Sequence, residues 1–175
     1  THNHPDSYRA ARAVAGAVFL ARQHKNKDQI RTYLRQYYPL DFRLEEIRDS
    51  YQGDATCEGS VPQALESFLE AEDFEDALRN AVSLGGDTDT LAAMAGSIAE
   101  PFFGIPEQIL AEGRKCYLPE MRDMVNCIRG AARSTPSLTV DKKRMLHVCF
   151  LRVQHPLFYV NSFTILIYSW AWKGR

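Results

Sequence analysis

The sequence has almost no net charge, no paired cysteine motif and no apolar leader at its amino terminus. A formal net charge of −1 over 175 residues gives no general electrostatic reason to bind nucleic acid or an anionic membrane. The cysteines show no CxxC spacing, which argues against a zinc ribbon or a thioredoxin-like redox site. We therefore expect reduced thiols in a cytoplasmic protein at Cys57, Cys116, Cys127 and Cys149.

The chain before residue 130 also lacks any alternating strand pattern, whereas apolar residues recur there at helical spacing. Phe74, Ala77, Leu78, Ala81 and Val82 follow the spacing of one buried helix face behind a capping residue, Asp73. Similar patterns predict a helix in each of several other segments: 10–21, 30–37, 44–47, 60–69, 107–115 and 119–129. The expected body is all-α, a compact orthogonal helical bundle.

Polar residues supply the expected starts of several helices. Asp6 or Ser7 would cap the first helix, and Asp41 would cap a short third helix. Ser60 and Gln63 match a capping box, so the stretch that precedes Ser60 is expected to be a loop. These side chains would satisfy backbone N–H groups that a helix leaves unpaired in its first turn.

The sequence after residue 130 differs in character. Residues 157–172 are rich in aromatic and β-branched side chains, but Asn161 and Ser162 interrupt them, and the run is shorter than the about 20 apolar residues of a membrane span. A packed or aggregation-prone hydrophobic tail is favoured over a membrane anchor. A third alternative is that the tail is not a sequence under natural selection. We divide the chain into a domain, 1–130, and an atypical hydrophobic tail, 131–175.

One short segment carries the chemistry of the domain. Gly85 and Gly86 permit a tight turn, and Asp87, Asp89 and Thr90 follow it where a helix begins. Two carboxylates and a hydroxyl are hard oxygen donors of the kind that magnesium and manganese prefer. A structural alternative is open on spacing alone: Asp87 or the next threonine would cap the helix, and Asp89 would be a favourable acid in its first turn.

The helix behind these residues is unusually rich in small side chains. Small residues on several faces would let this helix pack closely among its neighbours and present a site at its tip. Gly96 costs about 1 kcal/mol of helix propensity relative to alanine, so close packing is its expected compensation. Proline and glycine would end the helix at Pro101, Gly104 and Pro106.

The wider string from Asn80 to Ala99 resembles the carboxyl-terminal metal motif of the ADP-ribosylglycohydrolase family, which includes the dinitrogenase reductase-activating glycohydrolase. The segments 60–65 and 104–106 are similar to further parts of that family's pattern. Thr1-His2-Asn3-His4-Pro5 and the alanine-rich helix after it resemble the loop and helix at the middle of the family's domain. The resemblance extends over about residues 1–118 in the family's order.

The resemblance implies an all-α bundle of the ADP-ribosylglycohydrolase type. It implies that Asp87, Asp89 and Thr90 bind two divalent cations, Mg²⁺ or Mn²⁺, and that His2 contacts bound ADP-ribose. The implied reaction is hydrolysis of an N- or O-glycosidic bond, which releases ADP-ribose from a modified protein or from an ADP-ribose-containing small molecule. No catalytic role is expected for Cys57, because no basic partner lies near it in the sequence.

One part of the family's pattern is missing. A further metal motif, usually Thr-Asp-Asp, and an acidic residue on a loop that covers the substrate have no match here. The resemblance therefore predicts a domain that is incomplete at its amino-terminal side, with a complementary amino-terminal half as one partner. Two alternatives follow: an inactive remnant that binds ADP-ribose or metal, and an interaction module that uses the aromatic tail.

Overall fold

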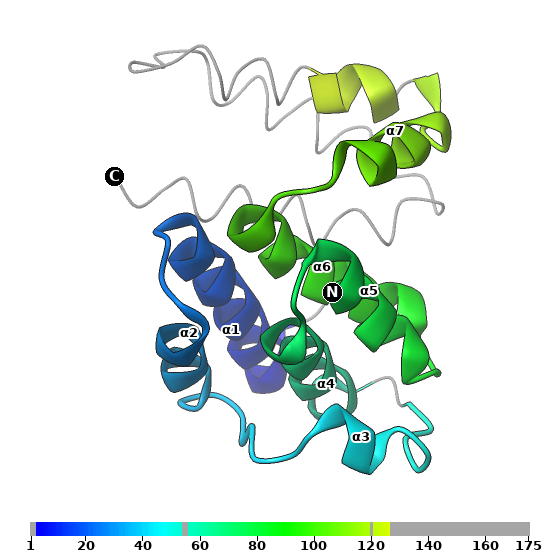
Figure 1. The fold of residues 1–175 in the computed structure, drawn as a ribbon. Helices are drawn as coiled ribbons and strands as arrows, with labels where there is room; N and C mark the ends of the chain where they lie inside the picture. The colour runs from blue at the N-terminus through cyan, green and yellow to red at the C-terminus, as the bar shows by residue number, and fades with distance from the viewer. Residues whose placement is uncertain (1–2, 54–55, 120, 127–175) are drawn as a thin grey trace. The chain divides into compact units, whose positions relative to one another are not determined.

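The described part of the computed structural model comprises residues 3–53, 56–119 and 121–126, and it contains helices and turns but no strand. The all-α fold of the ADP-ribosylglycohydrolase type is thereby confirmed. Figure 1 shows the helices in chain order: α1 (Pro5–Arg22), α2 (Lys27–Leu34), α3 (Leu44–Ile47), α4 (Cys57–Glu70), α5 (Phe74–Ser83), α6 (Thr88–Phe103) and α7 (Glu107–Lys115).

The described residues fall into two compact units. The first unit ends at Gly104 and contains α1 to α6, and the second begins at Ile105 and contains α7. Residues 121–126 of the second unit are helical, within the segment 119–129 where a helix was expected. The predicted tail, 131–175, and its boundary lie outside the described residues, so the division into domain and tail stays a prediction.

Helix α6 lies at the centre of the first unit, where it packs against α1, α4 and α5 (Figure 1). Its apolar side chains Leu91 and Ile98 are fully buried. A β-carbon at Gly96 would lie 3.0 Å from Cδ2 of Leu78 on α5, so the predicted close packing of this glycine is confirmed. The small side chains thus allow one helix to be surrounded by three others while its first turn reaches the surface.

An aromatic cluster joins the end of α4 to the end of α6. The Phe68 ring is fully buried and packs edge-on against Phe102 and Phe103, with ring centroids 5.3 and 6.1 Å away. Lys27, at the start of α2, places its Nζ 5.2 Å from the centre of the Phe103 ring and donates a hydrogen bond to the Ala71 carbonyl. The cluster therefore holds α2, α4 and α6 together.

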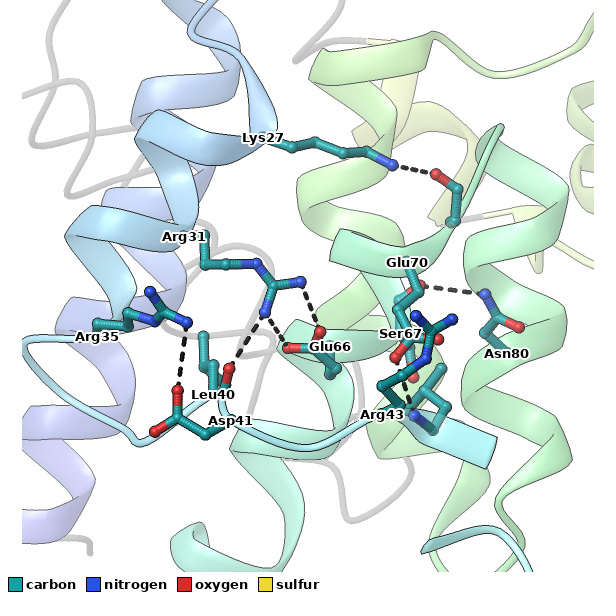
Figure 2. A network of polar contacts seen from close by, with 12 residues as sticks. Lys27, Arg31, Arg35, Leu40, Asp41, Arg43, Glu66, Ser67, Glu70 and Asn80 are labelled. Atoms are coloured by element: carbon teal, nitrogen blue, oxygen red, sulfur yellow. Dashed lines mark hydrogen bonds and ion pairs between the residues drawn. The ribbon is translucent and has the colours of Figure 1, made fainter. Parts of the chain in front are cut away.

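A buried ion pair connects α2 to α4, as Figure 2 shows. The Arg31 guanidinium donates to both carboxylate oxygens of Glu66, at 3.0 and 2.6 Å, and to the Leu40 carbonyl at 3.2 Å. The Glu66 side chain is only 2% exposed. Burial raises the pKa of Glu66, and the hydrogen bonds and charge of Arg31 partly offset that rise. Nearby, Glu70 accepts a hydrogen bond of 2.9 Å from the Leu44 amide at the start of α3.

Several predicted helix starts are wrong. His4, not Asp6 or Ser7, is the N-cap of α1, and its Nδ1 accepts from the Asp6 amide at 3.3 Å. Arg43 rather than Asp41 precedes α3. In both cases a residue outside the preferred capping set takes the position.

Helix α4 begins earlier than the capping-box pattern predicted. Thr56 is its N-cap and accepts a 3.0 Å hydrogen bond from the Gly59 amide, whereas Ser60 lies inside the helix and is buried. Asp73 caps α5 as predicted, with a 2.8 Å bond from the Asp76 amide.

Two further expectations need correction. Val82 on α5 is 54% exposed rather than buried. Pro101 lies inside α6 instead of ending it, and Gly104 is the residue at which that helix stops. Helix α2 ends at Leu34, within the segment 30–37 where a helix was expected. Among the described helices, none is both long and apolar enough to span a membrane.

Candidate metal centre

The expected ligands stand on the turn that leads from α5 into α6. Gly85 and Gly86 both adopt left-handed backbone conformations, with φ of 78° and 68°, which a residue with a β-carbon adopts only at a cost. Asp87 follows as the N-cap of α6, and its carbonyl accepts the Leu91 amide at 3.1 Å. The turn therefore places Asp87 directly at the helix start, as the sequence predicted.

The side chain of Asp87 does not cap the helix. It makes no capping hydrogen bond, although Asp87 occupies the N-cap position of α6. Asp73, in the same position on α5, accepts from the Asp76 amide at 2.8 Å. The structural alternative for Asp87 is thus right about its position and wrong about its side chain, whose oxygens stay available at the surface.

Asp89 and Thr90 lie in the exposed first turn of α6. Oδ1 of Asp89 accepts the Thr90 amide at 3.0 Å. A hydrogen bond with the Asp87 side chain is the largest cause that lowers the pKa of Asp89, followed by the Thr90 amide. The partial positive charge at the N-terminus of α6 stabilises these carboxylates. It adds no attraction for a cation.

The donors fit a hard divalent cation by their chemistry but not by their number. Asp87, Asp89 and Thr90 provide carboxylate and hydroxyl oxygens, the ligands that Mg²⁺ and Mn²⁺ prefer. Within the described ranges, no group of three His, Cys, Asp or Glu side chains could hold a metal ion. A complete coordination shell would need water, substrate or residues beyond those described.

The histidine motif before α1 is only partly described. His2, the expected substrate contact, lies outside the described residues. His4 is exposed, and its side chain caps α1. Cys57 is the first residue of α4 rather than part of a loop, and its thiol is free.

The loop between α3 and α4 contacts the turn that leads from α5 into α6. The sequence did not predict this contact. A β-carbon on Gly53 would lie 3.0 Å from the Cα of Gly86, which shows how closely the two backbones approach. Gly53 also has a left-handed backbone, with φ of 69°. The two glycines are distant in sequence, and no local pattern links them.

A shallow hollow lies elsewhere, on α1 and the segment after α2, and none of the expected ligands lines it. The hollow is lined by Pro5, Tyr8, Arg9, Arg12 and Tyr37. Arg9 there already bonds two carboxylates, Asp6 at 3.0 Å and Glu58 of α4. This arginine links α1 to α4 and is not a free anion site.

Comparison with known proteins agrees with the geometry. A family model described as ADP-ribosylglycohydrolase matches residues 1–134. A protein from Archaeoglobus fulgidus, described as uncharacterized, is 46% identical over 56 residues, which are 31% of this chain and 18% of that protein. The matched segment thus spans less than a fifth of that relative. No solved structure matches the chain with statistical significance. Since the family match covers most of the helical body together with the Asp87 turn, the chain belongs to the ADP-ribosylglycohydrolase family.

Proposed function

We propose that this chain forms part of a metal-dependent hydrolase that removes ADP-ribose from a modified protein or a related adduct. Asp87, Asp89 and Thr90 would bind Mg²⁺ or Mn²⁺, two cations in the complete site. The observation that carries the proposal is the Asp87 side chain, which occupies a helix N-cap without capping. Asp87 makes no capping hydrogen bond and lies close in sequence to a second carboxylate. A role in ligand binding explains this arrangement better than a role in helix stability.

The residues of this chain have distinct tasks in the proposed site. Asp87 and Asp89 supply negative charge, and the rigid start of α6 holds their backbone in place. The bound cations would polarise the scissile bond region and lower the pKa of a water molecule. His2 would contact the ADP-ribose.

The donor count favours a second candidate, a family member that binds ligand without turnover. The described residues bring no third carboxylate, imidazole or thiolate to Asp87 and Asp89. The chain alone would then bind a cation or ADP-ribose weakly, and a complementary amino-terminal half would be needed to supply the remaining ligands. The two candidates share the same binding site and differ in whether this chain hydrolyses by itself.

Titration with Mn²⁺ tests the site directly. The unaltered chain should bind Mn²⁺, and binding is measured as loss of the electron paramagnetic resonance signal of the free ion. Asp89→Asn should weaken binding by about ten-fold or more, because even outer-shell partners of a metal change its affinity about 10- to 100-fold. Asp28 provides a matched control, since it is an exposed acid in the first turn of α2. Equal binding by Asp28→Asn and Asp89→Asn would show that the assigned ligands are wrong.

Hydrolysis distinguishes the two candidates. The chain is incubated with Mn²⁺ and an ADP-ribosylated peptide, and released ADP-ribose is measured by chromatography, with and without the amino-terminal half of a family member. Release by the chain alone would support the complete enzyme, and release only after addition of that half would support a split site. Mn²⁺ binding without release in either experiment would support the binding-only candidate.

A further inference from the structure

The contact between Gly53 and Gly86 involves backbone alone on both sides. A β-carbon on Gly86 would lie 2.9 Å from Cα and 3.3 Å from N of Gly53, and 3.4 Å from the carbonyl oxygen of Gln52. A β-carbon on Gly53 would lie 3.0 Å from Cα of Gly86 and 3.5 Å from the amide nitrogen of Asp87. Since none of these neighbours is the end of a flexible side chain, relief of such a contact requires movement of one backbone segment.

The loop side of this contact is fixed to two helices. The Tyr51 amide donates to the Ile47 carbonyl of α3 at 2.8 Å, and the Tyr51 hydroxyl donates to the Gly59 carbonyl of α4 at 2.8 Å. Gly53 follows two residues later. These bonds hold the start of the loop, two residues before Gly53, against α3 and α4.

The other side of the contact leads directly to the expected ligands. The Gly86 carbonyl accepts the Thr88 amide at 2.9 Å, and the next residue, Asp87, is the N-cap of α6. A displacement of Gly86 is thus transmitted to the backbone of Asp87 and to the first turn that carries Asp89. The loop before α4 and the turn at Gly86 are therefore in direct backbone contact.

We propose that Gly53 is a positioning residue of the site: the absence of its side chain lets the loop before α4 press on Gly86, and this contact determines where Asp87 stands. The inference rests on the proposed function for its link to metal binding. It adds to that function a residue on a different element, one that touches neither metal nor substrate.

Gly104 provides a matched control for the strain of a substitution. Gly104 and Gly53 both have a positive φ, 79° and 69°, so alanine is strained at both positions, and the ψ of 160° at Gly104 places it in a region essentially restricted to glycine. A β-carbon at Gly104, however, would meet nothing within 4 Å. The comparison of Gly53→Ala with Gly104→Ala therefore separates the close contact from the strained backbone.

The experiment measures turn position and Mn²⁺ affinity on the full chain. Gly53→Ala should shift the amide ¹H–¹⁵N signals of Asp87 and Asp89 without metal, and should weaken Mn²⁺ binding by about ten-fold, as loss of a positioning partner does. Gly104→Ala should also lower the unfolding temperature, because of its backbone strain, and should leave both readouts unchanged. If the Asp87 and Asp89 signals of Gly53→Ala are the same as those of Gly104→Ala, the inference is overturned.

A double substitution gives an independent readout. Once Gly53→Ala has separated the two segments, Gly86→Ala should displace the Asp87 signal less than it does alone, whereas Gly53→Ala and Gly104→Ala should act additively. Additive displacement by Gly53→Ala and Gly86→Ala would overturn the inference. Should Gly53→Ala not fold, Gly53→Asn keeps the β-carbon with less backbone strain and should shift the same signals.

Failure of this inference can be told apart from failure of the proposed function. The amide signals decide the positioning role without any metal, and unaltered Mn²⁺ binding by Asp89→Asn would count against the ligand assignment alone. Normal amide signals in Gly53→Ala, together with Mn²⁺ binding that depends on Asp89, would overturn the positioning role and leave the metal site standing.

Discussion

At the scale of single residues, the pair of Arg31 and Glu66 places a carboxylate in the core of the described chain. Glu66 is almost fully buried, and the guanidinium of Arg31 bonds both of its oxygens (Figure 2). Burial of a carboxylate is unfavourable, and the bidentate geometry recovers part of that cost. The balance still raises the pKa of Glu66 above its ordinary value of 4.5.

This raised pKa predicts a pH dependence of stability. The folded chain holds the Glu66 proton more tightly than the unfolded chain, so stability should fall as the pH rises from 4.5 through the folded-state pKa. The free energy of unfolding of the unaltered chain, measured by urea titration between about pH 4 and 8, should therefore fall relative to that of Glu66→Gln. Arg31→Met combined with Glu66→Leu removes both charges and should lose the same dependence. A gain of stability by the unaltered chain with rising pH would contradict the assignment.

At the scale of elements, the starts of α5 and α6 look alike in sequence and differ in structure. Both helices begin after an aspartate, Asp73 and Asp87, but only Asp73 bonds the backbone with its side chain. A capping pattern predicts where a helix starts. It does not reveal whether the side chain turns inward to the backbone or stays outside for a ligand.

The two aspartates should therefore respond differently to alanine. Asp73→Ala removes a capping bond and should cost about 0.5–2 kcal/mol of stability. Asp87→Ala removes no such bond, so the loss should be smaller, while Mn²⁺ binding should disappear. Thermal unfolding of both variants without metal provides the comparison. An equal loss in both would mean that Asp87 is a structural cap in solution, and the metal proposal would lose its main support.

At the scale of the first unit, the core is organised around α6 and the aromatic cluster at its end. Phe68 is completely buried between Phe102 and Phe103, whereas Phe19 on α1 is 48% exposed. The same residue type therefore occupies a central and a peripheral place in one unit. Its removal should have very different consequences at the two places.

Phe68→Ala should lower the free energy of unfolding by about 3–5 kcal/mol, because it leaves a cavity in the core. Phe19→Ala should change it by no more than about 0.5 kcal/mol. Urea titration followed by circular dichroism measures both, and Phe68→Leu should fall between them if Phe68→Ala does not fold. Similar effects of Phe68→Ala and Phe19→Ala would show that the aromatic cluster is not the core described here.

The sequence by itself determined the class of the fold and the family, and it indicated the segment of the proposed site. Helical spacing identified most helices, because buried faces repeat along a helix with a fixed period. The exact starts of α1, α3 and α4 escaped it, since the cap positions are taken by His4, Arg43 and Thr56 and not by the residues that the capping patterns indicated.

Only the tertiary structure decided how the candidate site is held. The free side chain of Asp87 and the contact of Gly53 with Gly86 depend on where distant backbone segments meet. No local pattern encodes that meeting, because a glycine in a loop looks the same whether its missing side chain faces solvent or another backbone. The residue types of the proposed site were thus readable in the sequence, whereas their placement required the fold.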